Sequence, residues 1–316
     1  MKFAPVVLFV YSRLSHTIQT IESLKKNKLA QFTDLIIYSD APRSSSDVDR
    51  VSKVREYINT IQGFQSVKIN LREKNFGLSN SIISGVTEVL EMYESIIVLE
   101  DDLVTAPFFL QYMNEALTKY KEDIRVASIH GYTYPIKNPL PETFFMRGAD
   151  CWGWATWGRA WRFFNPNGQF LLDSLYSKNL ISEFDFNGAQ PFSMMLKGQI
   201  QGKNDSWAIR WHASIFLENM LTLYPGRSLV LNIGNDASGV HCGKTSIFDC
   251  ELSSVPINLQ SSAVKSSELA FLEFEDFYRM VNKAESSPIR RILGRLGLIP
   301  MIRFIKNKLP NKLVIF

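Results

Sequence analysis

The chain has 316 residues, of which 46% are hydrophobic and 21% are charged. This composition is typical of a folded globular protein and excludes a disordered, collagenous or coiled-coil chain as a description of the whole. The three cysteines, Cys151, Cys242 and Cys250, have no CxxC spacing. They therefore exclude a disulfide framework, argue against a structural zinc site and fit a reducing compartment.

The net charge of +4 is unevenly distributed. Seven Lys or Arg and no Asp or Glu lie within residues 286–316, so the rest of the chain carries a net charge of −3. Such a body has no broad basic face, and we expect no nucleic-acid partner. The first apolar run is too short for a signal peptide, and no apolar stretch approaches the roughly 18 residues that span a bilayer.

Two hydrophobic periodicities alternate over the first 130 residues. Short runs rich in Val and Ile predict strands, and stretches with helical spacing between them predict helices. The predicted strands are 5–11, 34–39, 66–71, 95–99 and 126–129, and the predicted helices are about 16–29, 47–62, 79–92 and 107–121. This alternation indicates βαβ units, so we expect an α/β fold with a mixed, mostly parallel sheet and flanking helices.

From about residue 144 the pattern changes to an aromatic cluster, and no Ser-, Gly- or Pro-rich linker precedes it. We expect a single domain over residues 1–250, built from the halves 1–130 and 131–250. Residues 251–285 are predicted to form an irregular and helical extension, and 286–316 a basic amphipathic tail.

Polar residues follow four of the predicted strands. They are Arg13, Asp40, the turn Asn75–Asn80 and the acid trio Glu100, Asp101 and Asp102. Ligands of parallel α/β sheets bind at the carboxyl ends of the strands, so we expect these residues to line a binding site.

The acid trio, Glu100, Asp101 and Asp102, follows a buried strand directly. Alternation along the strand would point Glu100 and Asp102 one way and Asp101 the other. Three adjacent anions need a nearby positive charge, and Mn²⁺ or Mg²⁺ with a diphosphate ligand would supply it. The alternative is a solvated acidic turn that caps the helix beginning near Pro107.

The run Ile97–Leu103 followed by Ala106–Phe109 resembles the metal motif of GT-A-fold glycosyltransferases. The similarity is to the family of Golgi β-1,2-N-acetylglucosaminyltransferase I, and weaker similarity covers most of residues 4–245. The resemblance implies a GT-A fold in which 1–130 binds a nucleotide sugar and 131–250 carries the acceptor and catalytic half.

The resemblance also implies residue roles in the first half. Asp102 would be the direct metal ligand, Glu100 and Asp101 would contact the donor sugar and ribose, and Arg13 would bind the uridine diphosphate. Asp40 would read the uracil, and the turn that begins at Asn75 would complete the nucleotide pocket. The residues themselves leave open a surface ion pair for Arg13, a simple turn for Asp40, and a helix start capped by Ser79.

In the second half, the resemblance implies a catalytic Asp beside a Trp and a His in a late loop near the pyrophosphate. Asp205, two residues before Trp207, is the expected general base, and His241 is the expected donor-binding His. The alternative for Asp205 is the N-cap of the helix that follows, and the alternative for His241 is a surface histidine in a turn.

The segment 151–161 contains four Trp, which favour either a core or a sugar-binding surface. We expect Asp150, Trp152 and Trp207 to contact the donor sugar or the acceptor. This region departs from the Golgi enzyme and is more similar to bacterial transferases that build surface polysaccharides.

The tail interleaves apolar and cationic residues, which favours association with an anionic membrane surface. It would hold the protein on the inner face of the cytoplasmic membrane, where lipid-linked acceptors reside. The alternatives are packing on the body and a dimer contact.

Together these features predict a metal-dependent, inverting glycosyltransferase that moves a sugar from a nucleotide-diphosphate sugar, a UDP-sugar by resemblance, to a glycan or lipid-linked acceptor. The other classes are a nucleotidyltransferase acting on sugar phosphates and a non-catalytic carbohydrate-binding relative. A nucleotidyltransferase would carry a glycine-rich loop after the first strand, and Tyr11–Ser15 contains no glycine.

Overall fold

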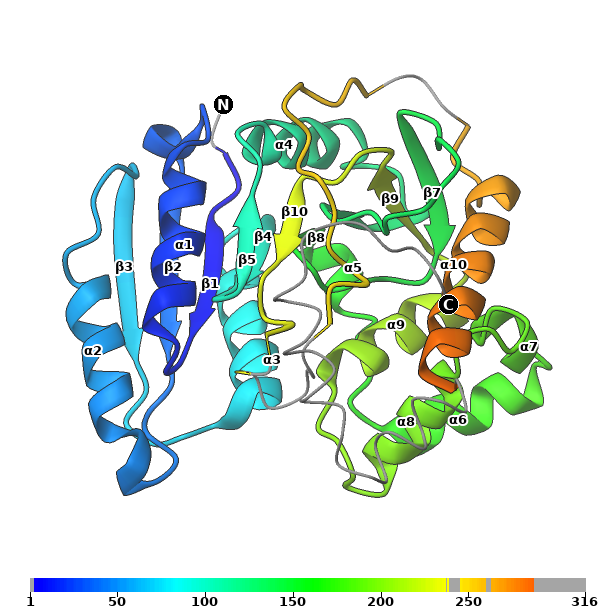
Figure 1. Ribbon diagram of the computed structural model, residues 1–316, viewed down its shortest axis with the longest axis horizontal. Coiled ribbons are helices and arrows are strands. Elements are labelled where there is room, and N and C mark those ends of the chain that lie inside the picture. Colours follow the sequence, from blue (N-terminus) through cyan, green and yellow to red (C-terminus); the bar gives the residue numbers. More distant parts are fainter. Residues whose placement is uncertain (1–2, 237, 239–244, 260–262, 287–316) are drawn as a thin grey trace, which may run out of the picture.

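A computed structural model describes residues 3–236, 238, 245–259 and 263–286. Its centre is an eight-stranded sheet of order β3-β2-β1-β4-β8-β6-β9-β7, and a two-stranded sheet pairs β5 with β10 (Figure 1). β1, β2, β3 and β4 are parallel to one another, β8 runs antiparallel between β4 and β6, and β7 is antiparallel to β9. The carboxyl ends of β4 and β6 therefore lie at the same edge of the sheet, with the beginning of β8 between them.

The strands are β1 Val6–Val10, β2 Asp34–Ser39, β3 Ser66–Leu71, β4 Ser95–Glu100, β5 Leu103–Thr105, β6 Val126–His130, β7 Thr143–Arg147, β8 Trp154–Trp157, β9 Leu221–Pro225 and β10 Val230–Asn232. The helices are α1 Leu14–Lys25, α2 Val48–Ile58, α3 Gly77–Leu90, α4 Phe109–Lys119, α5 Gly158–Trp161, α6 Gly168–Ser177, α7 Ile181–Phe184, α8 Phe192–Ile200, α9 Trp207–Leu217 and α10 Glu268–Ser286. Two 3₁₀ turns, Ala30–Phe32 and Ser45–Asp47, complete the described helical structure.

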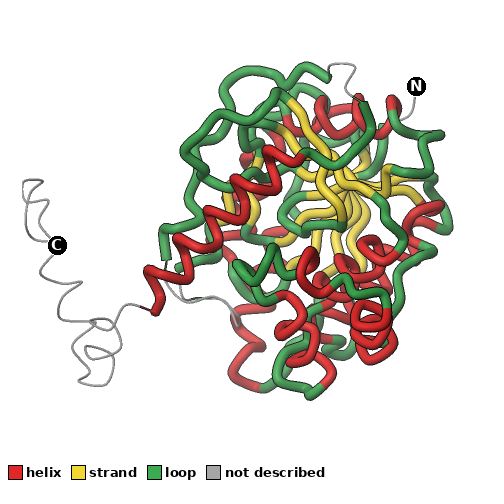
Figure 2. Tube along the Cα trace, turned by 90° about the vertical axis from the view of Figure 1, so that its right-hand side faces the viewer, coloured by secondary structure: helices red, strands yellow, loops and turns green. Residues whose placement is uncertain are grey.

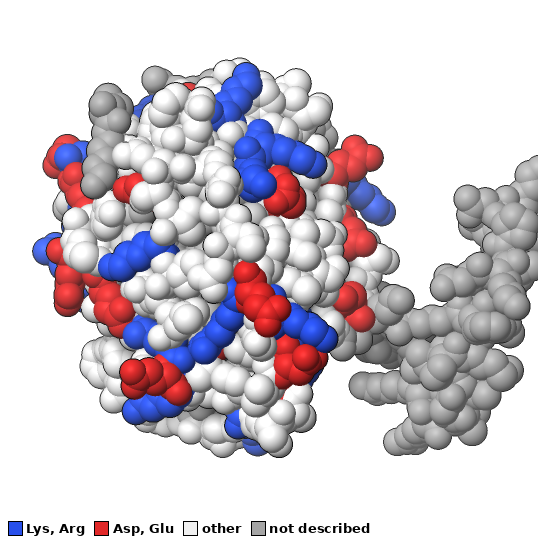
Figure 3. Space-filling view, turned by 90° about the vertical axis from the view of Figure 1, so that its left-hand side faces the viewer, with Lys and Arg blue, Asp and Glu red and all other residues white. Residues whose placement is uncertain are grey.

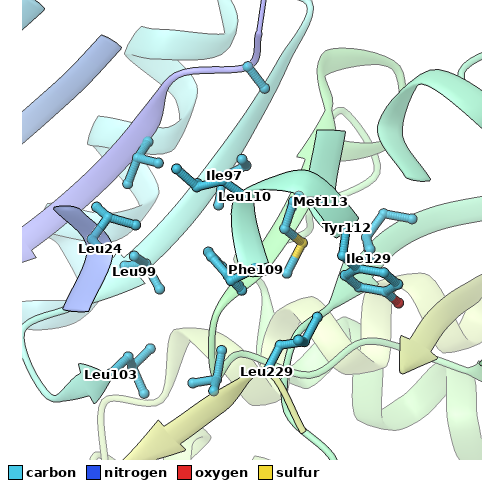
Figure 4. Close-up of a cluster of buried hydrophobic side chains, with 14 of the residues drawn as sticks. Leu24, Ile97, Leu99, Leu103, Phe109, Leu110, Tyr112, Met113, Ile129 and Leu229 are labelled. Atoms are coloured by element: carbon cyan, nitrogen blue, oxygen red, sulfur yellow. The ribbon is translucent and has the colours of Figure 1, made fainter. Parts of the chain in front are cut away.

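The central strands are buried on both faces, which explains their continuous apolar sequence. Alternate side chains of β1 and β4 pack against α1, α2 and α4 on one face, as the cluster around Leu99 and Phe109 illustrates (Figure 4). The other set packs against α3, α5 and α9. Figure 2 shows the resulting layers, with the twisted sheet between helices.

The predicted α/β class with a mostly parallel sheet is confirmed. Each strand and helix expected in the first 130 residues is present, with ends shifted by a few residues. The short antiparallel pair of β5 and β10 was not predicted, because two three-residue strands carry no periodicity. Strands from 1–130 and from 131–250 join in one continuous sheet.

Residues 251–259 and 263–267 of the extension form no helix or strand. α10 follows, and its apolar side packs against β7 and β9 through Phe274, Phe277 and Tyr278. No helix among the described residues combines the length and the apolar composition needed to cross a bilayer. On the face seen in Figure 3, basic and acidic side chains are interspersed and form no patch of one sign. The predicted amphipathic tail lies outside the described residues.

Candidate active site at the carboxyl edge of the sheet

The acid trio lies at the carboxyl end of β4, opposite the guanidinium of Arg13, which follows β1. Arg13 Nη2 donates to Oδ1 of Asp101, and it also donates to Oδ2 of Asp102 at 2.8 Å. Arg13 Nε lies 3.5 Å from the other Asp101 oxygen. The structure therefore brings these predicted residues together, and one half-buried guanidinium supplies part of the positive charge that the trio requires.

The predicted alternation of the three carboxylates is wrong beyond Glu100. β4 ends at Glu100 and the chain turns, so Asp101 and Asp102 both reach Arg13. The hydroxyl of Thr20 on α1 donates to the carbonyl of Asp101 at 2.9 Å and stabilises this turn. The alternative that the acids cap the next helix is also wrong, because Phe108 is the N-cap of α4 and no side chain caps it.

Burial is the largest influence on the pKa of Glu100 and of Asp101. It raises the pKa of Glu100 to about 8, and the Asp102 and Asp101 carboxylates add to that rise. Burial also raises the pKa of Asp101, which Arg13 opposes and Asp102 reinforces. A site of this kind favours a bound cation, because a cation would stabilise the ionised carboxylates.

A loop after β10 closes over the acid trio from the second half of the chain. The amide of Ile233 donates to the carbonyl of Asp102 at 2.9 Å. Gly234 packs so closely that a Cβ there would lie 2.9 Å from Cγ of Asp102 and 3.1 Å from Nη1 of Arg13. Asp236 then pairs with His16 of α1 at 3.2 Å. Ile233, Gly234 and Asp236 of this loop were not among the residues that the sequence predicted for the site.

The resemblance noted in the sequence implies a divalent cation at this edge. Among the described residues, no group of three or more His, Cys, Asp or Glu side chains has the geometry of a metal site. A site completed by ligand phosphates needs only one or two carboxylates. Arg13 engages Oδ2 of Asp102 alone, and no described residue donates a hydrogen bond to the Glu100 carboxylate. These hard oxygens fit Mg²⁺ or Mn²⁺.

Asp40 is buried at the end of β2, where it holds the start of α3. Its carboxylate accepts hydrogen bonds from the amides of Phe76, at 2.9 and 3.1 Å, and of Gly77, at 2.9 Å. Asn75 donates its side-chain amide to the carbonyl of Ala41 at 2.7 Å. Asp40 and Asn75 therefore hold the turn between β3 and α3 against the end of β2, and their contact with a nucleotide stays a prediction.

The structure does not support the alternative in which Ser79 caps the start of α3. Ser79 lies inside the first turn of α3, fully buried, and its hydroxyl accepts a hydrogen bond of 2.5 Å from Arg210 of α9. Sequence reasoning missed Arg210, which links the two halves of the chain. A buried arginine within an otherwise apolar helix was the available signal.

Asp205 lies just before α9, and its side chain is 64% exposed. The cap of α9 is Ser206, whose hydroxyl accepts from the amide of Ile209 at 3.2 Å, so the N-cap alternative for Asp205 is wrong. Oδ1 of Asp205 lies 3.8 Å from Nη2 of Arg210. Asp205 is thus a solvent-accessible carboxylate beside a cation, and no described contact places it at the acid trio.

Asp150 and Trp152 lie in the segment that enters β8. Oδ2 of Asp150 accepts from the hydroxyl of Tyr134 at 3.1 Å, and Oδ1 accepts from the amide of Cys151 at 2.8 Å. The half-buried ring of Trp152 packs edge-on against Tyr132, with ring centroids 4.8 Å apart. Because β8 begins between the ends of β4 and β6, both residues lie at the same edge of the sheet as the acid trio.

The prediction that Trp207 contacts a sugar is wrong. Its side chain is 3% exposed and stacks on Trp154 at 5.4 Å, within the core between the sheet and α9. Its large apolar ring is buried because α9 packs on the sheet at this point. His241 lies outside the described residues, so its predicted role remains a prediction.

No family model and no curated protein matches the chain. Among solved structures, TarS of S. aureus is 15% identical, with a TM-score of 0.32 over 47% of this chain and 25% of TarS. A mannosyltransferase of Pyrobaculum calidifontis, solved with GDP-Man and Mn²⁺, is 8% identical, with a TM-score of 0.34 over 69% of each chain. A UDP-glucose pyrophosphorylase is 11% identical, with a TM-score of 0.31 over 51% of this chain and 79% of that one. No residue role is transferred from these structures.

Proposed function

We propose that the protein is a metal-dependent glycosyltransferase. It would transfer a sugar, with inversion at the anomeric carbon, from a nucleotide-diphosphate sugar to a glycan or lipid-linked acceptor of a bacterial surface polysaccharide. The observation that carries the proposal is the acid trio at the carboxyl edge of a parallel sheet, where oxygens of Glu100 and Asp102 remain available beside Arg13. Carboxylates left available at this edge are suited to a cation and the phosphates it would bridge.

The residues around the trio would divide the work. Asp102 and Glu100 would hold a divalent cation, which, when bound, neutralises charge on a diphosphate leaving group. Arg13 fixes the orientation of Asp101 and Asp102 through its ion pairs, so the carboxylate oxygens of both residues are preorganised. Gly234 leaves the Asp102 carboxylate room that any side chain would fill.

Asp205 is the proposed general base. An inverting transfer needs one carboxylate to remove the proton of the acceptor hydroxyl as that oxygen attacks the sugar. The exposed side chain of Asp205 is open to an acceptor, and the guanidinium of Arg210 lies 3.8 Å from its carboxylate.

The test is a thermal-unfolding screen of UDP-, GDP-, dTDP- and CMP-sugars with and without Mn²⁺. A donor at 100 times its dissociation constant should stabilise the fold by about 2.7 kcal/mol, and only with the metal. Asp205→Asn should keep this stabilisation while turnover falls by at least about 100-fold. Stabilisation by nucleoside triphosphates instead of nucleotide sugars would point to a nucleotidyltransferase, and near-normal turnover of Asp205→Asn would remove the base assignment.

Residues 286–316 are proposed to bind the protein to anionic membrane surfaces. The alternation of cationic and apolar residues in this segment supports attachment to such a surface. Co-sedimentation of the full chain with phosphatidylglycerol vesicles, but not with phosphatidylcholine vesicles, is the expected result. Equal sedimentation with both would contradict an electrostatic attachment.

A further inference from the structure

His130 is an unusual buried polar residue at the carboxyl end of β6. Its side chain is fully buried, and neither ring nitrogen has a hydrogen-bond partner among the described residues. Its Nε2 lies 3.6 Å from Oδ2 of Asp150. An unpartnered buried histidine costs stability, so its position facing a carboxylate calls for a functional explanation.

Asp150 is fixed on two sides and open on another. The hydroxyl of Tyr134 holds Oδ2, the amide of Cys151 holds Oδ1, and the side chain remains 21% exposed. The ring of Tyr134 packs in turn against Tyr278 of α10, with ring centroids 5.3 Å apart. A carboxylate with a fixed orientation and free lone pairs is a preorganised acceptor for hydroxyl groups of a ligand.

The surroundings of Asp150 are aromatic. Trp152, which is partly exposed, packs against Tyr132 and against Phe248, whose ring centroid is 5.7 Å away. Saccharides present apolar ring faces and hydroxyl edges. An aromatic ring beside a fixed carboxylate therefore matches the two kinds of surface on one sugar ring.

The position of Asp150 distinguishes the acceptor from the donor. Trp154, the first residue of β8, pairs with Val98 of β4 on one side and with His130 on the other. The described contacts of Asp150 are with Tyr134, Cys151 and His130. The trio is instead contacted by Arg13 and by Ile233 and Gly234 of the loop after β10, so the described contacts of the two sites share no residue.

We propose that Asp150 binds hydroxyl groups of the acceptor saccharide, with Tyr134 positioning its carboxylate through a hydrogen bond and His130 limiting its position by contact at 3.6 Å. This inference rests on the proposed function, because a glycosyltransferase needs a saccharide site separate from its donor site. Trp152 provides the apolar surface of the same subsite. Tyr134 and His130 act through Asp150 and touch no substrate themselves.

The experiment compares Asp150→Asn and Tyr134→Phe with Tyr112→Phe in the full-length protein. Tyr134→Phe removes only the hydroxyl that donates to Asp150. Tyr112→Phe is the matched control, because its buried hydroxyl has no partner among the described residues. Each protein, presented as a multivalent complex with Mn²⁺, is applied to an array of bacterial and mammalian oligosaccharides. The thermal-unfolding screen with nucleotide sugars is run in parallel.

The expected result is that wild type and Tyr112→Phe retain the same glycans with equal affinity. Tyr134→Phe should bind them about 10-fold more weakly, and Asp150→Asn more weakly still, as expected for lost hydrogen bonds to a charged group. Stabilisation by donor and metal should be unchanged in all four proteins. Glycan binding that survives Asp150→Asn, or a wild type that retains no glycan, overturns the acceptor subsite. Failure of nucleotide sugars to stabilise any of the proteins would instead count against the proposed function.

Discussion

Gly234 lies directly against the carboxylate of Asp102, and a Cβ at position 234 would collide with Oδ2. The loop after β10 therefore meets the acid trio at the one residue type that leaves the carboxylate in place. We predict that Gly234→Ala displaces Asp102 from Arg13 and lowers affinity for a nucleotide sugar with Mn²⁺ by at least about 10-fold. This affinity is measured by titrating the nucleotide sugar in the presence of Mn²⁺ and recording the shift in the thermal-unfolding temperature.

Gly158→Ala is the control for that substitution. Its added Cβ would meet only the carbonyl of Leu90, at an ordinary contact distance of 3.7 Å. Donor binding should be unchanged in Gly158→Ala. Equal affinity in both variants would show that the Gly234 contact has no bearing on the site.

Asp102 and Asp101 should respond differently to neutralisation. Asp102→Asn removes a candidate metal ligand, so we expect Mn²⁺-dependent stabilisation by nucleotide sugars to disappear while the fold remains. Asp101→Asn leaves the half-buried Arg13 with a weaker partner and should lower the free energy of unfolding by about 2 kcal/mol. Urea unfolding with and without Mn²⁺ separates the two effects, and the exposed Asp49→Asn on α2 serves as control. Full metal dependence in Asp102→Asn would refute the ligand assignment.

Arg210 should be a structural link between α9 and α3. It donates to the hydroxyl of Ser79, to the carbonyl of Ser206 at 3.2 Å and to that of Pro166 at 3.4 Å. Arg210→Met replaces the apolar stem of the arginine but leaves these acceptors unpaired. We therefore expect urea unfolding to show a free energy of unfolding that is lower by about 2–3 kcal/mol. The exposed Arg50→Met on α2 should change stability by less than about 0.5 kcal/mol. An equally small loss of stability in Arg210→Met would contradict the role of Arg210 as a structural link.

The metal-free protein should lose stability as pH rises through the titration of Glu100. Its carboxyl stays protonated in the folded state up to a pKa of about 8, above its ordinary value of 4.5. Between these values the folded state binds more protons than the unfolded state, so the contribution present at low pH is lost as pH rises. Glu100→Gln removes this dependence. In EDTA we expect it to melt several degrees above wild type at pH 8.5 and close to wild type at pH 4.5.

Glu91→Gln is the control for the pH experiment, because Glu91 is exposed at the end of α3. The melting temperature of this control should follow wild type at every pH. If the melting temperatures of Glu100→Gln and wild type differed by the same amount at every pH from 4.5 to 8.5, Glu100 would not titrate as described.

The sequence was sufficient for the order of strands and helices in the first half and for the location of the acid trio. Both are local properties: the apolar runs at β1 and β4 need burial on two faces, and the acids follow β4 directly. Parallel connections then place Arg13 and the trio at one edge. The proximity of Arg13 and the acid trio could therefore be predicted from the sequence, although the distances between them could not.

Long-range packing decided the rest. Gly234 against Asp102, Arg210 on Ser79 and His130 facing Asp150 join residues far apart in the chain, and no local pattern specifies such pairs. Local pattern also misplaced Trp207, because an aromatic residue suits a core and a sugar surface equally. Sequence determined which residues could carry the chemistry, and tertiary structure decided which of them share a site, because side-chain proximity is set by how distant elements close-pack.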